Sequence, residues 1–159
     1  MKRIIILILI FFIITIPFYS PIKRYSIRSN KGNIININTY DSLTNYLNNK
    51  KINIVVIGKS NCEYCISYDT VLEEIIKNNN YDILSIKLDK ISYDEKMKIY
   101  NNIYIPSTCS KDNTYKKLIN GFGTPLTLFI KDNTSIGCIN GYSNIDNTLN
   151  YINNIYNKK

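Results

Sequence analysis

The sequence predicts an α/β fold in which helices flank a central mixed sheet. Short runs of β-branched and apolar residues, as long as buried strands, alternate with longer segments in which apolar residues recur every three or four positions. The chain has 159 residues, which is enough for one domain with a sizeable core. The predicted order of elements is β-α-β-α-β-α-β-β-α, and a hydrophobic helix precedes it.

The first half of this order follows from its hydrophobic pattern. Strands are predicted over Ile34–Asn38, Ile52–Ile57 and Asp82–Leu88. The last two strands are nearly continuous apolar runs, which is typical of strands buried on both faces. Helices are predicted over Tyr40–Asn49 and from Cys62 to about Lys77, each with an apolar face. Residues 58–61 form the loop that leads into the second helix.

The second half ends in a hairpin and a helix. A helix over Tyr93–Tyr104 should stop near Pro106, because proline cannot continue a helix. A loop over 105–113 and a short helix over Thr114–Ile119 follow. The hairpin strands are Leu126–Ile130 and Ser135–Ile139, with the turn at Lys131–Thr134. Residues Asn144–Tyr156 form the last helix.

The first 22 residues form a hydrophobic segment that favours a signal anchor. Basic residues flank a run without charge over residues 4–22, which as a helix is roughly 28 Å long and just spans a bilayer. One alternative is a cleaved signal peptide, although the chain has no alanine for a typical cleavage site. The other alternative is a strand or helix in the core of a soluble domain. Residues 23–33 are a basic tether, and residues 34–159 are the domain.

Charge and composition exclude several function classes. The net charge is +8, but residues 1–31 hold six basic and no acidic residues, while the remainder holds 14 lysines and 12 acids. The excess of basic residues in the N-terminal segment therefore indicates a segment placed at a membrane, and no nucleic-acid partner is expected. The absence of histidine excludes Ser-His-Asp and Cys-His catalysis and histidine metal sites.

The motif Cys62-Glu63-Tyr64-Cys65 lies where a strand leads into a helix. The free N–H groups of a helix N-terminus stabilise a thiolate and lower the pKa of the first cysteine. Such a thiol attacks a substrate disulfide, and a second thiol one turn away resolves the mixed disulfide. Cys62 is thus the predicted nucleophile and Cys65 the resolving thiol, with their disulfide as the redox centre and no other cofactor.

Two other readings of the motif remain open. A zinc site needs a second cysteine pair, whereas Cys109 and Cys138 are single and far apart, so no metal is expected. An inert structural disulfide between Cys62 and Cys65 is the other reading.

The charge of Glu63, between the two cysteines, disfavours the Cys62 thiolate and so should make the disulfide less oxidising.

The domain resembles thioredoxin-fold proteins over residues 34–156. The resemblance rests on INIVVIGKSN before CEYC, the long helix after it, DILSIKLD, and GFGTPLTLFIKDNTSIGCINGY. It implies a cis-proline at Thr124-Pro125 that faces the dithiol, a groove that Gly141 flanks, and Tyr64 packed on that groove. The stretch IGKSNCEYC is similar to bacterial thioredoxin-like proteins described as bacteriocin-transport accessory proteins.

The chain departs from the thioredoxin pattern at some positions. Val56 stands where thioredoxins have a buried aspartate that helps to move protons, and Asn61 replaces a tryptophan. Lys87 matches a family lysine near the dithiol or is a solvent-facing strand lysine. The resemblance also implies an insertion around residues 93–118.

The other two cysteines have no assigned redox role. Cys109 falls inside the insertion and Cys138 lies on the last strand. They pair as a structural disulfide if the domain faces an oxidising compartment, while two unpaired cysteines are the more ordinary outcome.

These observations predict a membrane-tethered thiol–disulfide oxidoreductase outside the cytoplasm, or a secreted one if the signal is cleaved. Its partners would be cysteine-containing exported proteins and a redox partner that recharges the dithiol. The alternative is a binding module for an export system, in which the dithiol is incidental.

Overall fold

The computed structural model describes residues 31–110 and 114–157. The predicted anchor or signal at 1–22 lies outside the described residues, as does the basic tether up to residue 30. Among the residues that are described, no helix is both long enough and apolar enough to cross a membrane.

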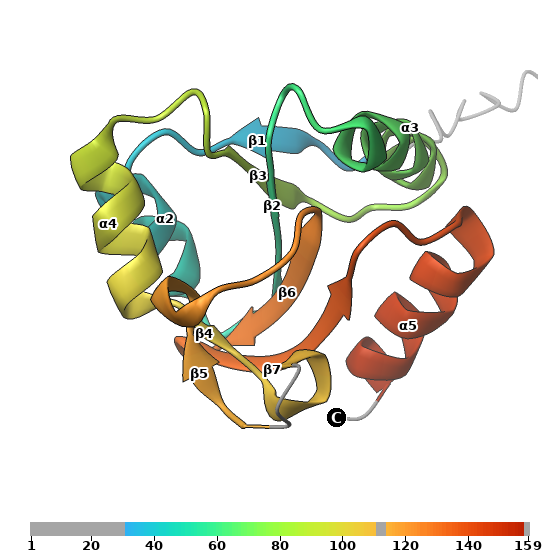
Figure 1. Cartoon of the computed structure of the whole chain (residues 1–159). Helices are drawn as coiled ribbons and strands as arrows, with labels where there is room; N and C mark the ends of the chain where they lie inside the picture. The colour runs from blue at the N-terminus through green and yellow to red at the C-terminus, as the bar shows by residue number, and fades with distance from the viewer. Residues whose placement is uncertain (1–30, 111–113, 158–159) are drawn as a thin grey trace, which may run out of the picture.

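A five-stranded mixed sheet forms the centre of the domain, as predicted (Figure 1). Its strands, in spatial order, are β1 (Ile34–Asn36), β3 (Ile83–Lys87), β2 (Asn53–Gly58), β6 (Leu126–Lys131) and β7 (Thr134–Asn140). The first three are parallel to one another, and β6 and β7 are antiparallel to their neighbours. Long connections through helices join the parallel strands, whereas a short turn suffices between β6 and β7.

Helices cover both faces of this sheet. One face packs against α2 (Tyr40–Leu47) and α4 (Tyr93–Asn102), and the other against α3 (Glu63–Asn78) and α5 (Ile145–Asn157) (Figure 1). Successive strand residues alternate between the two cores: Val55 and Ile57 contribute to the first, Ile54 and Val56 to the second. This alternation explains why the central strands are continuous apolar runs.

The segment between α4 and β6 differs from the prediction. It contains β4 (Tyr104–Ile105), the 3₁₀ turn η1 (Ser107–Cys109), β5 (Lys116–Lys117) and the 3₁₀ turn η2 (Leu118–Asn120). The predicted helix over Thr114–Ile119 is therefore wrong, and the preceding helix ends at Asn102 instead of Tyr104.

Cross-strand contacts explain this correction. β4 and β5 pair antiparallel, and the rings of Tyr104 and Tyr115 stack with their centroids 5.1 Å apart. The Lys117 ammonium also lies 5.6 Å from the centre of the Tyr104 ring. A helix of six residues is too short to be stable by itself, so these contacts decide the conformation.

A disulfide joins this segment to the main sheet. Cys109, at the end of η1, is bonded to Cys138 on β7, and their Cα atoms are 6.1 Å apart. The expectation of two unpaired cysteines is therefore wrong. The two cysteines are 29 positions apart in the sequence, which concealed their proximity.

Candidate active site: a dithiol at a helix N-terminus

Cys62 is the N-cap residue of α3. Its backbone is extended, and its Sγ accepts a hydrogen bond from the backbone N–H of Cys65 at 3.3 Å. An N-cap side chain satisfies one of the free N–H groups at the helix start, as a serine or aspartate oxygen does elsewhere. The sulfur therefore lies where the helix dipole favours a negative charge.

The loop before Cys62 is held by the neighbouring strand. The carbonyl of Gly58 accepts a hydrogen bond from the N–H of Leu88, and the N–H of Ser60 donates to the Asp89 carboxylate at 2.8 Å. The bond from Ser60 lowers the pKa of Asp89, which keeps this acceptor ionised. These contacts fix the point at which the chain leaves β2 and enters α3.

Thr124, which precedes Pro125, lies against Cys62, in line with the resemblance to thioredoxins. The peptide bond between them is cis. The Cys62 Sγ lies 3.7 Å from both the carbonyl oxygen and the hydroxyl of Thr124. The carbonyl can accept from a Cys62 thiol, and the hydroxyl can donate to a thiolate, so Thr124 serves both protonation states.

Gly141 and Tyr64 border this group of residues. The N–H of Gly141 donates to the carbonyl of Pro125 at 2.8 Å, and its φ of 85° lies in the region that favours glycine. The side chain of Tyr64 is 67% exposed at the start of α3. The predicted binding roles of these two residues stay predictions.

The two thiols have opposite pKa shifts. The pKa of Cys62 is lowered, mainly by a hydrogen bond from the Cys65 thiol, and further by the Cys65 N–H and the Thr124 hydroxyl. The pKa of Cys65 is raised, mainly by burial and also by the hydrogen bond that it donates to Cys62. Cys62 is partly exposed and Cys65 is 1% exposed. Cys62 is thus the thiol that ionises more readily, and Cys65, behind it, is the thiol that keeps its proton more firmly.

An ion pair lies beside Cys65. Lys87 is the register partner of Gly58 and contacts both oxygens of Asp69, at 2.5 and 2.8 Å. The resemblance to thioredoxins suggested Lys87 near the dithiol, with a solvent-facing strand lysine as the alternative, and Asp69 was not among the predicted site residues. Its position four residues after Cys65 was the available signal, because side chains at i and i+4 share a helix face.

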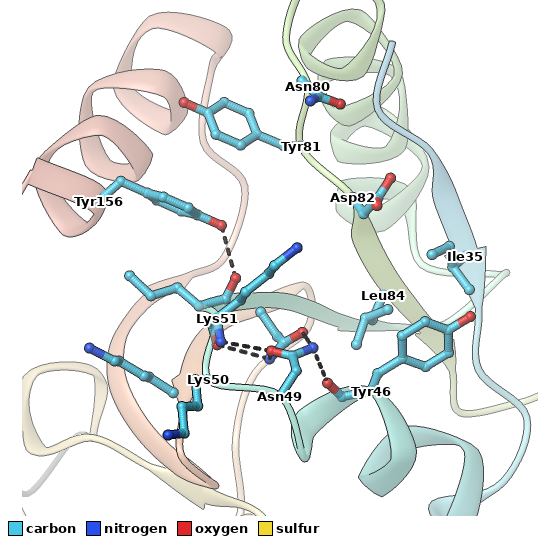
Figure 2. A pocket seen from close by; sticks show the side chains of 13 residues that line it. Ile35, Tyr46, Asn49, Lys50, Lys51, Asn80, Tyr81, Asp82, Leu84 and Tyr156 are labelled. Atoms are coloured by element: carbon cyan, nitrogen blue, oxygen red, sulfur yellow. Dashed lines mark hydrogen bonds between the residues drawn. The ribbon is translucent and has the colours of Figure 1, made fainter. Parts of the chain in front are cut away.

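A cavity lies at the other end of the sheet from the dithiol. It has a volume of about 530 Å³, and Figure 2 shows tyrosine, asparagine and lysine side chains around it. The Tyr156 hydroxyl donates to the carbonyl of Ile52, and Asn49 donates to the carbonyl of Tyr46. This cavity adjoins the amino end of β2, whereas the dithiol follows its carboxyl end. It holds no cysteine and is not the candidate site.

A smaller hollow lies beside the loop that leads into β6, and Cys109 of the disulfide also lines it. It has a volume of about 410 Å³, and its lining includes Phe122 and Leu126. Gly123 also lines it. The residues immediately before and after the Thr124–Pro125 pair are therefore both part of the hollow's lining. Within residues 31–110 and 114–157, no three histidine, cysteine or acidic side chains gather as metal ligands.

Solved structures similar to this one are thioredoxins. Thioredoxin from Trypanosoma brucei brucei has a TM-score of 0.59 at 10% identity, covering 82% of this chain and 97% of that one. The Malassezia sympodialis thioredoxin Mala s 13 has a TM-score of 0.57 at 14% identity, covering 77% and 90%. The Fasciola hepatica thioredoxin scores 0.53 at 16% identity, covering 76% and 97%. No protein-family model and no curated protein matches the sequence.

Proposed function

We propose that this chain, which has the thioredoxin fold, is a thiol–disulfide oxidoreductase whose redox centre is the Cys62/Cys65 dithiol. The observation that carries the proposal is the difference between the two thiols. Cys62 is a partly exposed helix N-cap with a lowered pKa, and Cys65 is buried one turn behind it with a raised pKa. A nucleophile and a resolving thiol need these two environments.

The reaction follows from this geometry. The Cys62 thiolate attacks one sulfur of a substrate disulfide, and the other substrate sulfur leaves as a thiolate that takes up a proton. Cys65 then loses its proton and attacks the Cys62 sulfur of the mixed disulfide. The second substrate thiol leaves, and the chain holds a Cys62–Cys65 disulfide. A redox partner that donates two electrons and two protons restores the dithiol, and the same steps in reverse oxidise a substrate.

Substrate polypeptide would bind along the loop that contains Pro125. The Thr124 backbone lies 3.7 Å from the Cys62 sulfur, so an extended segment paired with this loop brings its own sulfur to Cys62. Tyr64 and Gly141 border the same place, and the hollow lined by Phe122 and Leu126 offers apolar surface next to it. These features suit cysteine-containing protein segments better than a small polar disulfide.

We place this activity outside the cytoplasm, on a membrane tether, with cysteine-containing exported proteins as substrates. The apolar run over residues 4–22, between basic residues, supports a tether or an export signal. The Cys109–Cys138 disulfide supports an oxidising compartment, where such bonds persist. An impermeant maleimide added to intact cells should label Cys62. Labelling that appears only after lysis would contradict this placement.

The resolving step provides the test of the reaction itself. We expect a Cys65→Ser variant to accumulate a mixed disulfide at Cys62 with a disulfide-containing model peptide, detected by intact mass, while the parent chain releases reduced peptide. The Cys62→Ser variant, with Cys65 intact, is the matched control and should form no adduct. If Cys65→Ser forms no adduct either, the dithiol is incidental and a binding module is the better description.

A further inference from the structure

The reaction requires Cys65 to lose a proton where bulk water does not reach it. Its side chain is 1% exposed, and burial is the main reason that its pKa is raised. Cys65 attacks only as a thiolate, so a group beside it must take the proton during the resolving step. Val56, which faces the core that α3 and α5 cover, is apolar and cannot do this.

Gly58 leaves Lys87 close to Cys65. A Cβ built on Gly58 would lie 3.3 Å from the Cys65 Sγ and 3.8 Å from the Lys87 Nζ. The sulfur and the ammonium nitrogen are therefore separated by at most the sum of these two distances, about 7.1 Å. No side chain grows from Gly58 into the space between them.

Asp69 reaches the same place from α3. It lies one helical turn after Cys65, and helical side chains lean toward the N-terminus, so its carboxylate is directed back toward the turn that carries Cys65. Both carboxylate oxygens bond Lys87. The Asp69 side chain is 36% exposed, against 21% for Lys87. The pair is thus partly exposed, and its ammonium nitrogen lies within about 7.1 Å of the Cys65 sulfur.

We propose that Asp69, held in place by Lys87, accepts the Cys65 proton during the resolving step. This inference rests on the proposed function. The proton moves from the Cys65 sulfur to the Asp69 carboxylate while the new bond to the Cys62 sulfur forms, and Asp69 then releases the proton to solvent or to the departing substrate thiolate. No electrons pass through Asp69.

The other groups around Cys65 do not perform this task. Cys62 is the sulfur under attack, and Thr124, from the loop before β6, does not ionise. Glu63, also in the first turn of α3, is exposed to solvent. Lys59 contributes a backbone hydrogen bond to Cys65, and its ammonium is not a proton acceptor. Of the two ion pairs given for the described part of the chain, Lys87–Asp69 is the one with an atom near Cys65.

Rapid mixing of the reduced dithiol with limiting 5,5′-dithiobis(2-nitrobenzoate) tests the assignment. Thionitrobenzoate should appear in two phases: a bimolecular phase when Cys62 attacks, and a first-order phase when Cys65 resolves the adduct. In the Asp69→Asn variant we expect the second phase to slow by on the order of tenfold to a hundredfold at pH 7. The first phase should be unchanged. Glu73→Gln removes an equal charge from an exposed position on the same helix and should change neither phase.

The pH profile separates proton transfer from a structural effect. Well above the pKa of Cys65 the thiol ionises without an acceptor, so the variant and parent rates should converge there, and Asp69→Glu should restore much of the rate at pH 7. A second phase that is unchanged or faster in Asp69→Asn, or slower by the same factor at every pH, overturns the proposal. If the parent chain lacks the second phase, the proposed function itself fails.

Discussion

The two cysteine pairs of this chain differ in their separation along the sequence, in the secondary structure that holds them and in whether their sulfurs are bonded. Cys62 and Cys65 are three residues apart, lie at a helix start and are free thiols. Cys109 and Cys138 are 29 residues apart, lie on a 3₁₀ turn and a strand, and are joined to each other. The first pair has donors that stabilise a thiolate on one sulfur only, whereas the second fastens a loop-rich segment to the sheet.

The groups around Cys109 and Cys138 suit a structural disulfide. The N–H of Cys138 donates to the Tyr151 hydroxyl at 3.1 Å, and its Sγ lies 3.5 Å from the Thr108 hydroxyl oxygen. Cys138 lies within a strand and Cys109 ends a 3₁₀ turn, so neither sulfur caps an α-helix. Whether a cysteine is part of a redox centre or of a cross-link therefore depends mainly on the groups around its sulfur.

The largest expected effect comes from removing the nucleophile. Cys62→Ser should reduce catalysed insulin reduction by dithiothreitol to the uncatalysed rate, because Cys65 is too buried to start the exchange. The control is the double variant Cys109→Ser/Cys138→Ser, which should retain most of the activity. Comparable losses in both variants would mean that the two pairs do not differ in function.

The second effect concerns stability. The variant Cys109→Ser/Cys138→Ser should lose about 3 kcal/mol of unfolding free energy, because the bond closes a loop of 29 residues and restricts the unfolded chain. Urea unfolding of this variant and of the oxidised parent measures the difference. Cys62→Ser, compared with a parent reduced only at the dithiol, should change stability far less. An equal loss in both would refute the structural role of Cys109–Cys138.

The sequence predicted the main architecture and the core of the site. Runs of β-branched and apolar residues identified the strands, and the position of the Cys62/Cys65 motif between a strand and an amphipathic helix placed Cys62 at the helix N-terminus. The β4/β5 pairing and the contact between η1 and β7 could not be predicted, because they depend on residues far apart in the chain. Asp69 was missed for the same reason, since its bond to Lys87 joins a helix to a strand.

The third effect is a shift in reactivity with pH. Iodoacetamide should alkylate Cys62 with a midpoint below 9.0, the ordinary value for a cysteine thiol, because hydrogen bonds lower its pKa. The lowered pKa also means that Cys62 adds stability to the reduced fold above the unfolded-state pKa, and that this stability is lost as pH falls through the folded-state pKa. Thr124→Val should raise the midpoint modestly by removing one donor. An unchanged or lower midpoint in that variant counts against the Thr124 contact.

The smallest effect belongs to Glu63. Its exposed carboxylate lies next to Cys62, so Glu63→Gln should lower the Cys62 pKa slightly and raise the reduction potential of the dithiol. Equilibration with glutathione buffers at low ionic strength measures the potential, and added salt should shrink the difference. No change, or a lower potential, would show that the Glu63 charge does not influence the pair.

The most direct test of the account is to titrate both pairs in one experiment. The full chain is equilibrated with dithiothreitol buffers of increasing reducing strength, the free thiols are alkylated, and the labelled cysteines are mapped by mass spectrometry. We expect the Cys62–Cys65 disulfide to open and close reversibly in buffers that leave Cys109–Cys138 closed. A Cys62/Cys65 pair that never forms a disulfide, or two pairs that open together, would contradict it.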